Sequence, residues 1–186
     1  PARPNVILLL ADDMNHDSPG FMGGRIPDLT PHLDRLAGAG MVFSHCHNAS
    51  SICGPSRAAM MTGLYPQSNG EMGHVHRIPA WWEKRHAERK VTSMATCLRE
   101  HGYFTARLDK SGSRFDTWDE ALNSSRTGVG RDPNLYHAQT KRLIAKAQTQ
   151  GKPFFMNINS RDPHEYWAGS PQESLPWAFK NLELGP

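Results

Sequence analysis

The stretch with the clearest chemical character runs from Cys53 to Gly63 and has the sequence Cys-Gly-Pro-Ser-Arg-Ala-Ala-Met-Met-Thr-Gly. Proline suits the first turn of a helix and glycine suits the position just past a helix end, so Pro55 and Gly63 predict a helix between them. Cys53 then lies at the helix N-terminus, where free N–H groups and the helix dipole favour negative charge. Arg57, four residues later, shares its helix face. The spacing predicts a nucleophile beside an anion-binding corner.

Two adjacent carboxylates follow a continuous apolar run. Val6–Ala11 has no polar alternation, which is typical of a parallel strand buried on both faces, and it ends at Asp12 and Asp13. Ligands of α/β sheets bind at the carboxyl ends of strands, and two neighbouring carboxylates repel each other unless a cation lies between them. Oxygen ligands favour Ca²⁺ or Mg²⁺ over zinc. A solvated acidic turn or a helix cap is the alternative interpretation.

The order of these and later motifs resembles the type I sulfatases. The family signature, Cys-x-Pro-Ser-Arg followed by Thr-Gly, is present from Cys53 to Gly63, and an Asp-Pro-His motif ends at His164. The resemblance implies that a formylglycine-generating maturation enzyme oxidises Cys53 to formylglycine, whose hydrate attacks sulfur. It also implies that Asp12, Asp13 and the modified Cys53 bind the metal. A buried structural cysteine is the alternative for Cys53.

The resemblance also implies roles for Lys110 and His164, and the composition of an irregular segment adds His74 as a candidate. The family pattern Gly-Lys-x-His falls on residues 109–112, so Lys110 is the expected sulfate-binding lysine, whereas Gly112 stands where the family has histidine. His164 is the expected general acid or sulfate-binding residue. His74 lies in an irregular segment of histidines and tryptophans that could form a substrate pocket or, equally, a packing cluster. Because the histidine is replaced by Gly112, we expect low activity.

Alternating helical and strand-like patterns predict one α/β domain with a largely parallel sheet flanked by helices. We expect helices at residues 30–37, 53–62, 92–101 and 134–148, and strands at residues 6–11, 41–47, 103–108 and 154–159. Residues 117–133 are expected to form a polar loop. By resemblance, residues 1–186 correspond to the N-terminal part of an alkaline phosphatase/sulfatase-like catalytic domain, and we expect no second domain.

Composition argues against several other functional classes. The net charge of the 186 residues is only +3 and the basic residues are dispersed, which disfavours a nucleic-acid partner. No apolar run is long enough for a membrane helix, and no signal peptide is visible, although the resemblance implies a periplasmic, secreted or lysosomal location. The three cysteines give no disulfide framework. Free thiols are expected at Cys46 and Cys97, with a disulfide between them as the alternative.

The predicted function is hydrolysis of a sulfuric ester or sulfamate with Ca²⁺ or Mg²⁺ and formylglycine as cofactors. The run from Gln67 to His74 most resembles the heparan N-sulfatase branch, which implies a sulfated sugar substrate. In the family the remaining metal ligands fall beyond residue 186, so we expect an incomplete N-terminal portion whose open sheet edge favours self-association. The alternatives are a phosphonate or phosphate monoester hydrolase and a non-catalytic relic.

Overall fold

The computed structural model describes residues 3–73, 78–110, 112–123 and 131–164 of the 186-residue chain. These residues form a four-stranded parallel sheet in the order β1-β4-β2-β3. The strands are β1 (Val6–Asp12), β2 (Phe104–Leu108), β3 (Glu120–Leu122) and β4 (Phe154–Pro163). Because the strands are parallel, their carboxyl ends meet at one edge. The predicted α/β class is confirmed.

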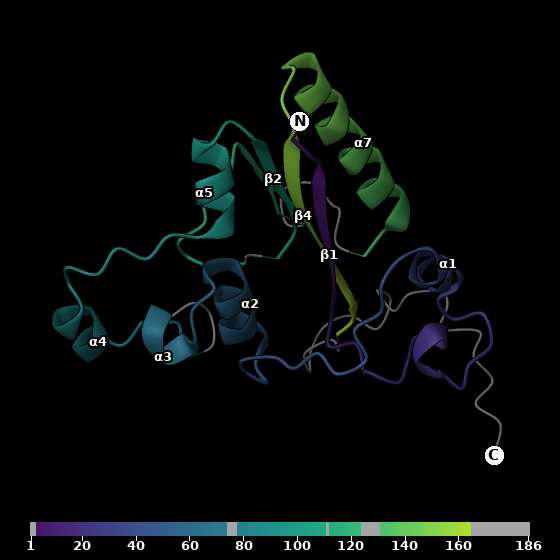
Figure 1. The fold of residues 1–186 in the computed structure, drawn as a ribbon, viewed down its shortest axis with the longest axis horizontal. Helices are drawn as coiled ribbons and strands as arrows, with labels where there is room; N and C mark the ends of the chain where they lie inside the picture. The colour runs from purple at the N-terminus through teal and green to yellow at the C-terminus, as the bar shows by residue number, and fades with distance from the viewer. Residues whose placement is uncertain (1–2, 74–77, 111, 124–130, 165–186) are drawn as a thin grey trace.

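Helices cover the sheet on two sides, with α7 (Pro133–Thr149) on one face and α2 (Cys53–Thr62) and α5 (Met94–Glu100) on the other (Figure 1). Alternate residues of β4 face the two layers, as expected for a strand. Phe154 belongs to the core cluster that contains Leu143 of α7, whereas Phe155 packs with Met61 of α2. The remaining described helices are η1 (Gly20–Met22), α1 (Pro31–Ala39), α3 (Pro66–Asn69) and α4 (Ala80–Arg85).

Helix α2 begins and ends where the sequence predicts. Pro55 occupies its first turn, where no intrahelical partner is needed for a backbone N–H. Gly63 ends the helix in the left-handed conformation, with φ of 67°, and donates its N–H to the carbonyl of Ala59 at 2.8 Å. A left-handed residue at this position is favourable for glycine and strained for most others. Local sequence therefore suffices to define this helix.

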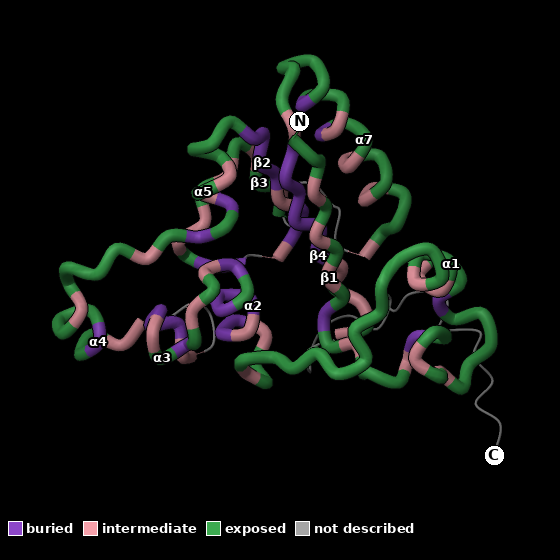
Figure 2. Tube along the Cα trace, in the orientation of Figure 1, coloured by how far each residue is buried: buried purple, intermediate pink, exposed green. Residues whose placement is uncertain are grey.

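Strand β1 is partly buried on one face and exposed on the other, in contrast to the prediction from its apolar run that both faces are buried. Ile7 and Leu9 are 51% and 55% exposed, whereas Val6 and Leu8 pack against the cluster that contains Phe155 (Figure 2). Within the described part of the chain, β1 has β4 on one edge only, and the core cluster that packs against α7 contains residues of β2 and β4 but none of β1. The outer face of β1 is therefore left uncovered by the described residues. Whether this exposed surface drives self-association stays a prediction.

Two other segments differ from their predicted structure. Residues 41–47 form no strand, and Met41 and Phe43 are 78% and 73% exposed. Conversely, the predicted polar loop at residues 117–133 contains β3, whose Glu120 pairs with Ala106 of β2. Both errors have the same cause, because a short segment becomes a strand only where a neighbouring strand offers hydrogen bonds.

Helix α5 packs on the sheet through Ala95, which is fully buried, and Leu98, which contacts the cluster around Phe155. Met94 and Cys97 are exposed. Cys46, Cys53 and Cys97 are all free, so the structure supports the free-thiol interpretation over the disulfide. None of the helices in the described ranges is long and apolar enough to cross a membrane.

Candidate active site

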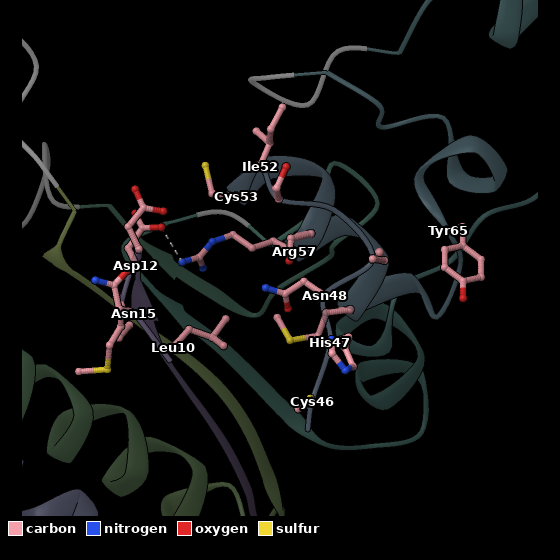
Figure 3. A pocket seen from close by; sticks show the side chains of 18 of the residues that line it. Leu10, Asp12, Asn15, Cys46, His47, Asn48, Ile52, Cys53, Arg57 and Tyr65 are labelled. Carbon is pink, nitrogen blue, oxygen red and sulfur yellow. Dashed lines mark hydrogen bonds and ion pairs between the residues drawn. The ribbon is translucent and has the colours of Figure 1, made fainter. Parts of the chain in front are cut away.

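An open pocket of about 1040 Å³ lies between the end of β1 and the start of α2 (Figure 3). Its lining includes Asp12, Asp13, Cys53 and Arg57. Cys53 is the first residue of α2, and Ile52 before it is extended, with φ of −101° and ψ of 135°. The apolar side chain of Ile52 cannot accept hydrogen bonds from the first-turn N–H groups. These groups are therefore suited to bind an anion beside Cys53.

The carboxylate of Asp12 is the electrostatic centre of this edge. Asp12 is only 2% exposed. Its Oδ1 lies 3.4 Å from Nη2 of Arg57, the contact drawn as a dashed line in Figure 3, and its Oδ2 pairs with Nζ of Lys110. The structure thus brings together three of the predicted site residues from β1, α2 and the end of β2. Two cations therefore share one buried carboxylate.

The buried amide of Asn159 also contacts this cluster, and sequence reasoning missed it. Asn159 Oδ1 accepts from Nη1 of Arg57, and its Nδ2 donates to the carbonyls of Leu108 and Lys110 at 3.0 Å each. One signal was available in the sequence, because Asn157 and Asn159 interrupt the apolar run of the predicted strand. Buried amides need hydrogen-bond partners, so such residues often mark a polar network.

A second network missed by sequence reasoning lies directly before Lys110. Asp109 is 3% exposed and has φ of 61°, a left-handed conformation that is uncommon for residues other than glycine. Arg161 binds it with two contacts, Nε to Oδ2 at 2.7 Å and Nη2 to Oδ1 at 3.2 Å. This hydrogen bonding raises the pKa of Arg161. The hydroxyl of Tyr136 donates to Asp109 Oδ2 at 3.3 Å, and burial raises the pKa of that hydroxyl.

Asp13, the residue after Asp12, contacts His164. Nε2 of His164 lies 3.4 Å from Oδ2 of Asp13, which has φ of 60°. The backbone of His164 is held as well, since Arg131 donates to its carbonyl at 2.8 Å. The structure therefore places His164 near the end of β1, and its role stays a prediction. His74 lies outside the described residues.

The donor chemistry of Asp12 and Asp13 suits a hard divalent cation, but these two residues supply only part of a site. Ca²⁺ binds about six to eight oxygen ligands. Among the described residues, no group of three or more His, Cys, Asp or Glu side chains is arranged to hold a metal. The two carboxylates therefore fit as contributors to a larger set.

The position of Gly112 is closed to larger side chains. A Cβ atom there would lie 2.8 Å from Oδ2 of Asp116 and 2.8 Å from Cγ of Met61. Neither neighbour moves easily, because Met61 is 1% exposed and Asp116 Oδ2 accepts from the N–H of Ser113 at 2.9 Å. A larger side chain at position 112 would therefore require Asp116 or Met61 to move.

Asp116 should make stability depend on pH. Burial raises its pKa above the ordinary value of 3.8, so the folded state binds this proton more tightly than the unfolded state. Its contribution to stability is therefore complete below about pH 4 and is lost as pH rises through the raised pKa. We expect Asp116→Asn, which keeps an acceptor for Ser113, to be more stable than the wild type at pH 7. Urea unfolding at pH 4 and pH 7 measures this difference.

Asp119→Asn is the control, because it should change the stability at pH 7 in the opposite direction. Burial acts to raise the pKa of Asp119, but hydrogen bonds from Thr105 and Arg99 outweigh it and the pKa falls. This carboxylate stabilises the fold above its unfolded pKa, so Asp119→Asn should lose stability at pH 7. Equal stability of Asp116→Asn and wild type across the pH range would contradict the assignment.

Comparison with known proteins agrees with the motif order. A sulfatase family model matches residues 4–180. Human N-sulphoglucosamine sulphohydrolase is 34% identical over 182 residues, which cover 92% of this chain and 34% of that protein. The chain spans about a third of the length of the curated relatives that it matches first.

Solved structures support the fold. The crystal structure of Ps i-CgsB in complex with k-i-k-neocarrahexaose has a TM-score of 0.63 at 24% identity and covers 88% of this chain and 46% of that chain. Phosphonate monoester hydrolase of Agrobacterium radiobacter has a TM-score of 0.59 at 19% identity, covering 88% and 42%. At these sequence identities, the likeness shows a shared fold and nothing more. Because the family model matches residues 4–180 of the 186-residue chain, the chain belongs to the sulfatase family.

Proposed function

We propose that this chain provides the sulfate-binding portion of a hydrolase that cleaves a sulfuric ester or sulfamate. The observation that carries the proposal is the convergence of Arg57 and Lys110 on Asp12 beside the N-terminus of α2. Both cations and the N–H groups of the first turn are suited to three anionic oxygens arranged around one centre. Cys53 lies at the same corner, where a nucleophile would reach the bound group.

Each of these residues would have a separate role in the reaction. Arg57 and Lys110 would bind the sulfate oxygens and stabilise charge as the bond to the leaving group breaks. His164, held near Asp13, would give a proton to the departing oxygen or nitrogen. Formylglycine made from Cys53 would supply the oxygen nucleophile. Overall, the S–O or S–N bond of the substrate breaks, an oxygen from water bonds to sulfur, and the alcohol or amine leaves with a proton.

Asp12 and Asp13, with the modified Cys53, would contribute ligands for Ca²⁺ or Mg²⁺. Bound metal would supply positive charge next to the reacting sulfate. A sulfated sugar is the proposed substrate, because the human relative is named for N-sulphoglucosamine.

Peptide mass spectrometry across residue 53 tests the proposal. The chain would be produced in a host that contains formylglycine-generating machinery, with a known sulfatase as positive control and Cys53→Ala as negative control. We expect a peptide about 18 Da lighter than the cysteine form, since an aldehyde oxygen replaces the thiol. Unmodified Cys53 beside a fully converted control would instead favour a non-catalytic relic.

Two further measurements separate the alternatives. Matched sulfate and phosphate monoesters, offered to a form of the protein that contains the complete domain, distinguish a sulfatase from a phosphonate or phosphate monoester hydrolase. The latter is supported only by a fold likeness at 19% identity. Calorimetric titration of the complete domain with Ca²⁺ tests the relic hypothesis, because a relic should bind the ion weakly or not at all.

A further inference from the structure

We infer that Asn159 is a positioning residue that holds Arg57 and Lys110 together as one anion-binding unit. The inference rests on the proposed function, because it concerns the same two cations. Neither the sulfatase motifs in the sequence nor the pocket lining includes Asn159. Its side chain nevertheless joins the three elements that supply the site, since β4 carries Asn159, α2 carries Arg57 and the end of β2 leads to Lys110.

The hydrogen bonds of Asn159 define a single orientation of its amide. Arg57 can only donate, so its Nη1 requires the oxygen Oδ1. The carbonyls of Leu108 and Lys110 can only accept, so they require Nδ2. Asn159 is fully buried, and water cannot easily replace any of these partners. These three hydrogen bonds therefore all require the amide in this one orientation.

The two carbonyls bracket the left-handed residue Asp109. By binding the residues on either side of it, Asn159 fixes the turn from which the Lys110 side chain reaches Asp12. Long lysine and arginine side chains lose considerable conformational entropy when they bind an anion. A rigid amide on a central strand removes part of that cost in advance, because it pre-organises both cations before the anion arrives.

Asn157 provides a matched control two residues earlier on the same strand. It is also 0% exposed, but its Oδ1 and Nδ2 have no hydrogen-bond partner among the described residues. Replacing Asn157 with leucine therefore breaks no side-chain contact to the site. Asn159→Leu introduces the same side chain into the same strand and removes all three contacts to the site.

The test is titration of the chain with inorganic sulfate, followed by NMR. In the wild type, we expect the Arg57 side-chain N–H signals and the Lys110 amide to shift together with one Kd. Asn159→Leu should weaken sulfate binding at least about tenfold, because hydrogen bonds to a charged group are lost. Asn157→Leu should bind sulfate as the wild type does. Equal affinity of Asn159→Leu and the wild type would overturn the inference.

A second readout does not depend on sulfate. In the wild type and Asn157→Leu, the bond to Asn159 should restrict rotation of the Arg57 guanidinium, so that separate Nη resonances are resolved. In Asn159→Leu these resonances should merge. Resolved resonances in Asn159→Leu would refute the positioning role even if the chain bound no sulfate. If the wild type bound no sulfate but the Nη signals behaved as expected, the proposed anion site would be contradicted and the positioning role of Asn159 would not.

Discussion

Arg57→Met should lower the free energy of unfolding by about 3 kcal/mol and abolish measurable sulfate binding. Arg57 is 6% exposed, and its removal leaves Oδ1 of Asp12 and Oδ1 of Asn159 buried without their donor. An uncompensated buried polar group costs more than the intact contact contributes. The anion site would also lose one of its two cations. Urea unfolding and sulfate titration measure the two effects separately.

Arg99→Met is the matched control for the loss of an arginine from an ion pair. Nε of Arg99 lies 2.8 Å from Oδ1 of Asp119, but the Arg99 side chain is 44% exposed, so we expect a change of about 0–1 kcal/mol and unaltered sulfate binding. Arg57→Lys should restore charge without the two-pronged contact to Asp12 and Asn159. If Arg57→Met were as stable as Arg99→Met, the buried network would not contribute to stability as described.

Gly112→His is expected to destabilise the chain by about 1–3 kcal/mol and not to recover the family's histidine function. The new Cβ would meet Asp116 Oδ2 and Met61 Cγ at 2.8 Å, a distance that real Cβ contacts do not tolerate. The ring would have to displace a buried methionine or a carboxylate bound to the N–H of Ser113. Thermal unfolding, and formylglycine-dependent turnover in a complete domain, measure the two parts of this prediction.

Gly38→His is the control for introducing the same side chain. Gly38 lies exposed in α1, where an added Cβ atom would meet no other atom within 4 Å. Histidine there should change stability by less than about 0.5 kcal/mol or increase it slightly, because glycine is unfavourable inside a helix. An increase in sulfatase turnover with Gly112→His would show that the neighbourhood of Asp116 rearranges more readily than its packing indicates.

The elements that could be predicted from the sequence are those whose signals are local. Helix α2 follows from Pro55 near its start and Gly63 past its end, and each depends on the backbone preferences of one residue. The parallel arrangement follows from alternating helix and strand patterns. Parallel strands end at a common edge, so the approach of Asp12 to Lys110 and of Asp13 to His164 was predictable in outline.

Features that depend on distant residues emerge only in the folded chain. Partial burial of β1 on one face depends on the cluster around Phe155 that packs against it, and β3 becomes a strand because β2 lies beside it. Asn159 joins the site because folding brings it to Arg57, 102 residues away in sequence. The space at Gly112 is set by side chains of α2 and of the following turn. A local pattern cannot encode these contacts, because their energies arise only when segments far apart in the chain meet.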